Sequence, residues 1–144
     1  MITLKWYRIA GAVFLIFAAI ALFNLGGSLI NIISNALLYS ISIKITLEAI
    51  ILLKYYVFFF IMYLALGIIY LRITEKRLNS YANLSLITLA IALGIYLLGT
   101  IAIVGILFYL GENAGNTFYL ITHIVYGALL LVALIFAIIA LRKK

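Results

Sequence analysis

The segment YANLSLITLAIALGIYLLGTIAIVGILFYL, residues 81–110, contains no charged side chain. As an α-helix it would be about 45 Å long, which exceeds the roughly 30 Å of hydrocarbon in a bilayer. Three further stretches are similarly apolar, and we expect spanning helices at about residues 8–33, 48–71, 81–110 and 116–141. The sequence therefore predicts an all-α integral membrane protein, a four-helix transmembrane bundle that occupies residues 1–144 as a single domain.

The composition supports this class and excludes others. Hydrophobic residues make up 69% of the chain and charged residues 9%, whereas soluble domains are roughly 45–50% apolar and about 25% charged. The short connections leave no room for a soluble domain. Cysteine is absent, which excludes disulfides and thiolate chemistry. The composition, rich in isoleucine and tyrosine, is similar to that of proteins from hot-acid archaea.

The basic residues predict the orientation of the chain. Eight of the ten lie in three clusters, which flank the first and fourth apolar segments and separate the second from the third. Because Lys and Arg are in excess in cytoplasmic loops, we expect a multi-pass protein of the cell membrane with both termini cytoplasmic. Such clusters meet anionic headgroups, so the expected partner is the lipid bilayer, with no nucleic acid. The predicted cytoplasmic anchors are Lys5, Arg8, Arg72, Lys76, Arg77, Arg142, Lys143 and Lys144.

The chain between the first two spans has a different pattern. Residues 39–48 alternate polar and apolar side chains with a period of two, which is typical of a half-buried strand. A short amphipathic helix with Lys44 and Glu48 four residues apart is the competing interpretation. Because an isolated strand cannot satisfy its backbone in lipid, we favour a helical or irregular segment at the outer interface.

Small residues recur in the third and fourth segments at spacings of three to five, which allows helices to approach closely in a membrane. We expect them to serve packing within the chain, with docking of another subunit as the alternative. In the first span Gly26-Gly27 offers a kink or break, and Asn116 is the expected N-cap of the fourth span. The predicted packing residues are Ala90, Gly94, Gly99, Ala102, Gly105, Ala133, Ala137 and Ala140.

His123 is the only histidine, and it shares a helical face with Tyr119 and Tyr126. Three functional interpretations are open: an axial haem ligand, a donor to a quinone headgroup, and a proton-responsive group. His123 precedes Arg142 by 19 residues, about 28 Å along a helix, which would place it near the outer boundary of the hydrocarbon core. We favour a structural histidine between interfacial tyrosines and predict no cofactor; a quinone or lipid contact by these three residues is the alternative.

The sequence contains no recognisable set of catalytic side chains. The three acidic residues, Glu48, Glu75 and Glu112, lie at span ends or in connections. Ion-coupled carriers need an acidic group near mid-membrane. The small multidrug carriers are similar in length and span number, but they depend on a glutamate in the first span, where this chain has none. Paired carboxylates and clusters of metal ligands are also missing, so we predict neither enzyme activity nor a metal site.

These features favour a non-catalytic accessory subunit of a larger membrane complex, such as a respiratory or electron-transport assembly, which would stabilise neighbouring helices. Its partners would be other membrane subunits or further copies of the chain. Two alternatives stay open. One is a small oligomeric transporter or channel for a neutral or lipid-like solute, with a path past Asn24, Asn31 and Tyr96. The other is a lipid-embedded, self-assembling coat protein.

Overall fold

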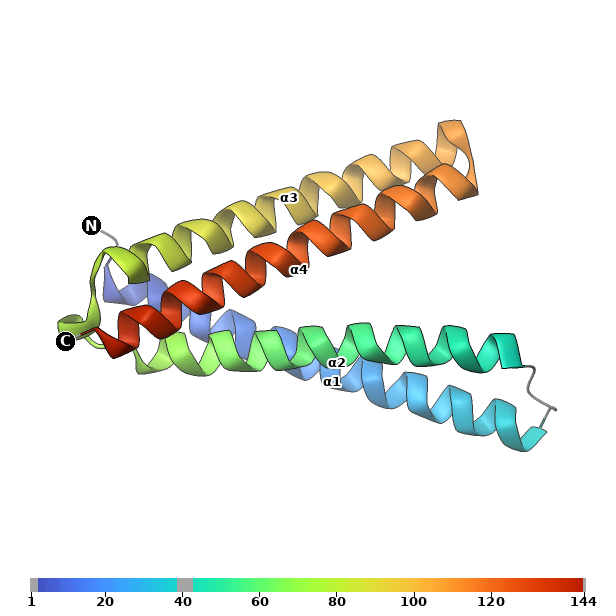
Figure 1. Ribbon diagram of the computed structural model, residues 1–144, viewed down its shortest axis with the longest axis horizontal. Helices are drawn as coiled ribbons and strands as arrows, with labels where there is room; N and C mark the ends of the chain where they lie inside the picture. Colours follow the sequence, from blue (N-terminus) through green and yellow to red (C-terminus); the bar gives the residue numbers. More distant parts are fainter. Residues whose placement is uncertain (1–2, 39–42, 144) are drawn as a thin grey trace. The chain divides into compact units, whose positions relative to one another are not determined.

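The computed structural model describes the backbone of residues 3–38 and 43–143 and the side chains of residues 3–34 and 53–143. Within these ranges the chain forms four long helices and one 3-10 turn (Figure 1). All four helices are long and apolar enough to cross a bilayer. The predicted all-α class with four helices of spanning length is confirmed, which fits a multi-pass membrane protein. The elements are α1 (Leu4–Leu38), α2 (Ile43–Arg72), η1 (Glu75–Arg77), α3 (Ser80–Leu110) and α4 (Glu112–Arg142).

All four helices extend beyond the predicted spans, α1 and α2 by the largest number of residues. α1 comprises 35 residues and continues without a break through Gly26 and Gly27. α2 begins at Ile43, so residues 43–48 form its first turns and the strand interpretation is wrong for them; residues 39–42 lie outside the described part of the chain. A continuous helix satisfies its backbone amides internally, which a lone strand cannot do.

The connection between α3 and α4 is the single residue Gly111. Its φ of +91° and ψ of 175° define a conformation that is essentially restricted to glycine. The Gly115 N–H donates to the Gly111 carbonyl oxygen at 3.2 Å, so helical bonding starts at this residue. The expectation that Asn116 caps α4 is therefore wrong. Because Gly111 reverses the chain in one step, the polar residues after it are already helical, and the Asn116 side chain is exposed.

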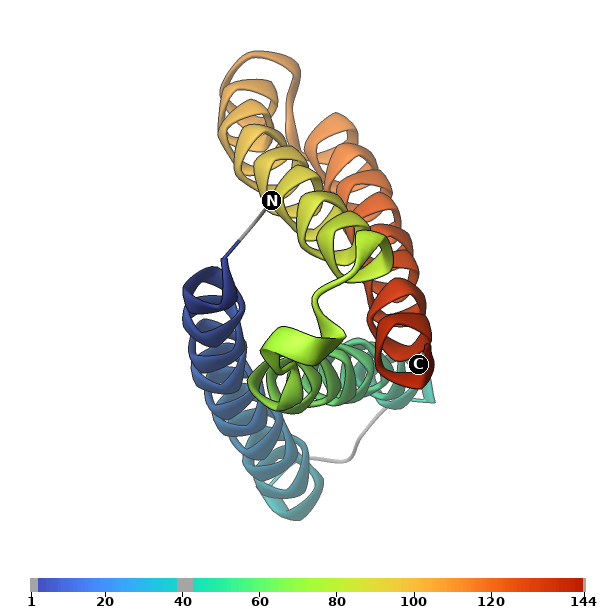
Figure 2. The same ribbon diagram turned by 90° about the vertical axis from the view of Figure 1, so that its left-hand side faces the viewer.

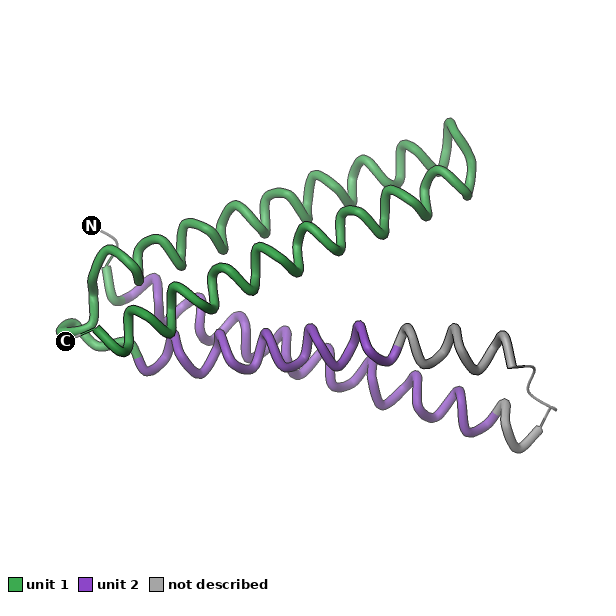
Figure 3. Tube along the Cα trace, viewed as in Figure 1, with its two compact units in different colours: residues 1–4, 73–144 green, residues 5–72 purple. Residues whose placement is uncertain are grey.

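The chain divides into two compact units (Figure 3). One unit, residues 5–72, is the hairpin of α1 and α2. The other comprises residues 73–144 together with residues 1–4 and contains the hairpin of α3 and α4. Within this second hairpin the two helices run antiparallel, side by side (Figures 1 and 2). We refer to these units as the α1–α2 hairpin and the α3–α4 hairpin.

Two glycines allow close contact within the α1–α2 hairpin. A Cβ added to Gly11 would lie 3.1 Å from the Gly67 carbonyl oxygen, and one added to Gly67 would lie 3.1 Å from the Gly11 carbonyl oxygen. The two backbones therefore contact one another without intervening side chains. Beside them Tyr7 and Tyr70 pack edge to face, with ring centroids 6.0 Å apart, and both side chains are fully buried.

Polar side chains at the start of α3 and just before it form hydrogen bonds to backbone carbonyl oxygens of alanine residues in α4. The Ser85 hydroxyl, which is fully buried, donates to the Ala133 carbonyl oxygen at 2.6 Å. Asn79 caps α3, because its Oδ1 accepts from the Ala82 N–H at 3.0 Å. Its Nδ2 also donates to the Ala140 carbonyl oxygen at 3.2 Å. Small side chains permit such close approach of helices, so alanine suits the α4 positions that α3 contacts.

Candidate functional site

Four ring side chains gather near the middle of the α3–α4 hairpin, and we call them the aromatic cluster. Tyr119, His123 and Tyr126 recur at i, i+4 and i+7, which places them on one side of α4, and Tyr96 comes from α3. The ring centroids of Tyr119 and His123 are 4.0 Å apart. The Tyr96 ring lies 5.6 Å from His123 and 4.7 Å from Tyr126. The structure thus joins the three predicted residues through Tyr96, which the sequence had suggested only as part of a possible transport path.

The His123 ring has a defined hydrogen bond to its own helix. Its Nδ1 lies 2.9 Å from the Tyr119 carbonyl oxygen. A carbonyl oxygen can only accept, so Nδ1 carries the proton, and in the neutral ring Nε2 is then an acceptor. A neutral His123 therefore cannot donate a hydrogen bond from Nε2 to a quinone carbonyl. Donation from the aromatic cluster would come from the tyrosine hydroxyls or from a protonated histidine.

The aromatic cluster extends from the interior to the surface of the protein. Tyr126 is 2% exposed and Tyr119 is 53% exposed, while Tyr96 and His123 are half-buried. Tyrosine and histidine combine an apolar body with a polar tip, and such residues favour the membrane–water interface. This gradient of burial suits a group of rings that packs inward on protein and outward on lipid headgroups.

Close contact between α3 and α4 next to the aromatic cluster depends on Gly99. A Cβ added there would overlap the Thr122 methyl group and lie 3.0 Å from its hydroxyl oxygen. That hydroxyl donates to the Phe118 carbonyl oxygen at 2.9 Å, and the Thr100 hydroxyl donates to the Tyr96 carbonyl oxygen at 2.8 Å. Both threonines thus donate within their own helices, a local bond typical of threonine in membrane helices.

The other predicted packing residues have different environments. Ala133, Ala137 and Ala140 are fully buried. By contrast, a Cβ added to Gly94 or Gly105 would have no neighbouring atom within 4 Å. The remaining two, Ala90 and Ala102, are exposed and half-buried respectively. Four of the predicted residues, Gly99, Ala133, Ala137 and Ala140, are therefore buried within the described part of the chain, while the other four are partly or fully exposed.

The predicted anchors also differ in their contacts. Arg77 donates to the carbonyl oxygens of Leu141 and Lys143. The Lys143 ammonium lies 4.7 Å from the centre of the Tyr81 ring. The rest of the described anchors are exposed, and Lys144 lies outside the described residues. The exposed ones are Lys143 and also Lys5, Arg8, Arg72, Lys76 and Arg142.

Neither a metal-binding cluster nor a family relationship adds a residue to the candidate site. Among the residues that the structure describes, no three His, Cys, Asp or Glu side chains gather in a way that could hold a metal ion. The aromatic cluster therefore stands as the candidate site on its rings and hydroxyls alone. No protein-family model, curated protein or solved structure matches this chain.

Proposed function

We propose that this chain is a non-catalytic structural subunit of a larger complex in the cell membrane, with both termini cytoplasmic. The complex would be a respiratory or other electron-transport assembly, and the subunit would stabilise helices of its neighbours. The low coverage of the helices supports this proposal: between 17% and 33% of the residues in the most apolar part of each helix are buried. Most residues of these stretches are therefore at least partly accessible to lipid or to other membrane helices.

The observation that carries the proposal is an uncovered face of α3. Gly94, Leu98, Ile101 and Gly105 recur at i, i+4, i+7 and i+11 and so share this face. Leu98 and Ile101 are each 70% exposed, and both glycines face open space. Glycine in a helix costs about 1 kcal/mol relative to alanine, and no contact within the α3–α4 hairpin offsets that cost at Gly94 or Gly105. Small residues allow a second membrane helix to approach, so we assign this face to a helix of another subunit.

The polar groups of the α3–α4 hairpin support a structural role. The hydroxyls of Ser85, Thr100, Thr117 and Thr122 all donate to backbone carbonyl oxygens of α3 or α4. Hydroxyls bonded in this way hold helices together or satisfy their own helix. They supply neither a nucleophile paired with a base nor a set of convergent donors.

Within the assembly we assign the aromatic cluster to contact with a lipid or quinone headgroup. His123 precedes Arg142 by 19 residues, so the ring lies about 28 Å along α4 from that anchor. If Arg142 lies at the inner boundary of the hydrocarbon core, His123 lies near the outer boundary. The exposed ring of Tyr119 beside His123 suits a planar headgroup, with the tyrosine hydroxyls as donors.

The proposal is tested by gentle extraction from the native membrane, followed by native mass measurement, identification of partners by mass spectrometry and a visible absorption spectrum of the same sample. We expect co-migration with redox subunits. Migration as a lone protomer would refute the proposal. A colourless homo-oligomer without partners would instead favour the transporter, channel or coat-protein alternatives.

Two matched variants sharpen this test. Gly94→Leu fills the open position on the proposed face and should release the partners while leaving the helical content unchanged. Ala128→Leu adds nearly as much bulk to α4 at an exposed position, and it should leave the complex intact. Equal retention of partners in both variants would show that the Gly94 face is not the contact.

A further inference from the structure

We propose that the base of the α3–α4 hairpin, where α3 begins and α4 ends, binds the phosphate of an anionic membrane phospholipid through Lys76, Arg142 and Lys143. This inference rests only on the membrane location in the proposed function and is independent of any partner subunit. It arises from the way the fold brings together two basic clusters that are far apart in the sequence. We call these three side chains the basic site.

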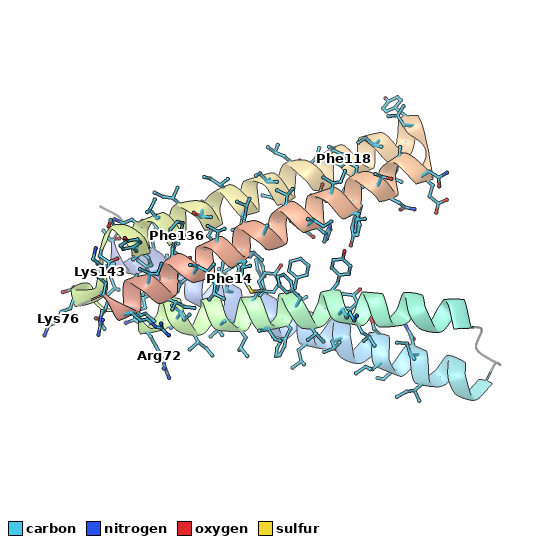
Figure 4. All side chains as sticks on the ribbon, in the orientation of Figure 1. Phe14, Arg72, Lys76, Phe118, Phe136 and Lys143 are labelled. Atoms are coloured by element: carbon cyan, nitrogen blue, oxygen red, sulfur yellow. The ribbon has the colours of Figure 1, made fainter. Side chains whose placement is uncertain are left out.

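Hydrogen bonds hold the η1 turn against the end of α4. The Arg77 guanidinium donates to the carbonyl oxygens of Leu141 and Lys143, the second at 3.1 Å. Two residues further along, Asn79 donates to the Ala140 carbonyl oxygen at 3.2 Å. The turn that carries Lys76 is thereby fixed beside the last residues of α4. Figure 4 shows Lys76 and Lys143 at this same end of the hairpin.

The same hydrogen bonds remove an obstacle to anion binding. The last carbonyl groups of a helix carry partial negative charge and repel anions. Here Arg77 and Asn79 supply donors to three of the last carbonyl oxygens of the α4 end. Arg77 thus offsets the charge of the helix terminus beside the three side chains of the basic site. All three are exposed, as is Glu75, the one acidic side chain in the turn.

The surroundings of Lys143 distinguish a lipid from a free phosphate ion. Its ammonium lies 4.7 Å from the centre of the Tyr81 ring, and tyrosine is typical of the membrane interface. One, two and three turns further into the apolar part of α4 lie Ile139, Ile135 and Val132, which are 37%, 48% and 40% exposed. A phosphate at the basic site would therefore have an apolar surface below it on which an acyl chain could lie. A phospholipid can occupy both the basic site and the apolar surface, whereas inorganic phosphate can occupy only the basic site.

The experiment uses the purified full chain in a neutral detergent at low ionic strength. Short-chain phosphatidylglycerol, phosphatidylcholine and inorganic phosphate are titrated separately, and binding is followed by native mass spectrometry and by the thermal unfolding midpoint. We expect phosphatidylglycerol alone to bind and to raise the midpoint. Each basic side chain near a membrane surface contributes about 1 kcal/mol, so Lys143→Gln should weaken binding about fivefold.

Lys54→Gln is the matched control, because it removes the same charge from an exposed position outside the basic site. It should leave the affinity for phosphatidylglycerol unchanged. Arg142→Gln should weaken binding to a similar degree as Lys143→Gln, while Lys143→Arg should retain it. Equal binding of phosphatidylcholine, equal binding of inorganic phosphate, or an equal loss in Lys54→Gln would each overturn the proposal. Because no partner subunit is present, these outcomes are separate from the test of the proposed function.

Discussion

Replacing Gly99 with alanine tests whether α3 and α4 contact one another at the position that the structure shows. In an open helical position, alanine is favoured over glycine by about 1 kcal/mol. Gly94 is such a position, because an added Cβ meets no atom within 4 Å. At Gly99 the added Cβ would overlap the Thr122 methyl group and lie 3.3 Å from the Thr122 Cβ. Overpacking of this kind costs about 1–3 kcal/mol.

These magnitudes predict opposite effects for two chemically identical substitutions. Gly94→Ala should raise the free energy of unfolding by about 1 kcal/mol, while Gly99→Ala should leave it unchanged or lower it by about 2 kcal/mol. The difference between the two variants should therefore be about 1–3 kcal/mol. The assay is equilibrium unfolding in mixed micelles with increasing sodium dodecyl sulfate, followed by the helical circular dichroism signal.

A second substitution identifies the cause of the effect. Thr122→Ser removes the methyl group that overlaps the new Cβ and retains a hydroxyl that can bond to the Phe118 carbonyl oxygen. In the Thr122→Ser background, Gly99→Ala should raise the free energy of unfolding. The coupling free energy between the two positions should be about 1 kcal/mol or more. If Gly99→Ala stabilises the protein as much as Gly94→Ala does, the two helices are not in contact at Gly99. The alignment of α3 with α4 would then be refuted.

Substitutions at three further positions probe the same hairpin by the same unfolding assay. Ser85→Ala removes the buried hydrogen bond to Ala133 and should cost about 0.6–1.7 kcal/mol; an unchanged stability would mean that the hydroxyl makes no net contribution. Gly111→Ala forces a side chain into a backbone conformation reserved for glycine and should cost about 1–3 kcal/mol, and a neutral result would contradict the one-residue turn. Tyr96→Leu should be about 0.5–1.5 kcal/mol less stable than Tyr96→Phe, because only the phenyl ring preserves the contacts in the aromatic cluster. Equal stability of these last two variants would argue against those contacts.

The alignment of α3 with α4 explains why the aromatic cluster could be predicted only in part. Tyr96 and Tyr126 each lie 15 residues from Gly111, so a one-residue turn brings them opposite one another. The predicted start of the fourth span at Asn116 implies a longer connection. With that connection, Tyr96 would lie opposite a residue about one helical turn further along α4 than Tyr126. The spacing of Tyr119, His123 and Tyr126 within one helix was sufficient to group these three, but their partner on α3 depends on the conformation of Gly111.

The contacts at the base of the α3–α4 hairpin also depend on the one-residue turn at Gly111, because this turn aligns α3 with α4. The basic residues around Arg77 and those around Arg142 are evident as membrane-flanking clusters, because charge near apolar segments is a local property of the sequence. That Arg77 reaches the end of α4 is not local, since the bonded residues are 64 and 66 positions apart. No spacing rule within one segment connects such residues.

The amino-acid sequence by itself determined the class of the protein, the number of helices long enough to span a bilayer and the approximate limits of most of them. These properties follow from segment length, apolar composition and the positions of charges, all of which are local. Only the tertiary structure decided which faces meet: Gly11 with Gly67, Gly99 with Thr122, and Tyr96 with the α4 rings. The physical reason is that helices which are apolar on every side have no contrast between a buried and an exposed face. Their contacts are chosen by shape, small residues and a few hydrogen bonds, which a single sequence does not align across two helices.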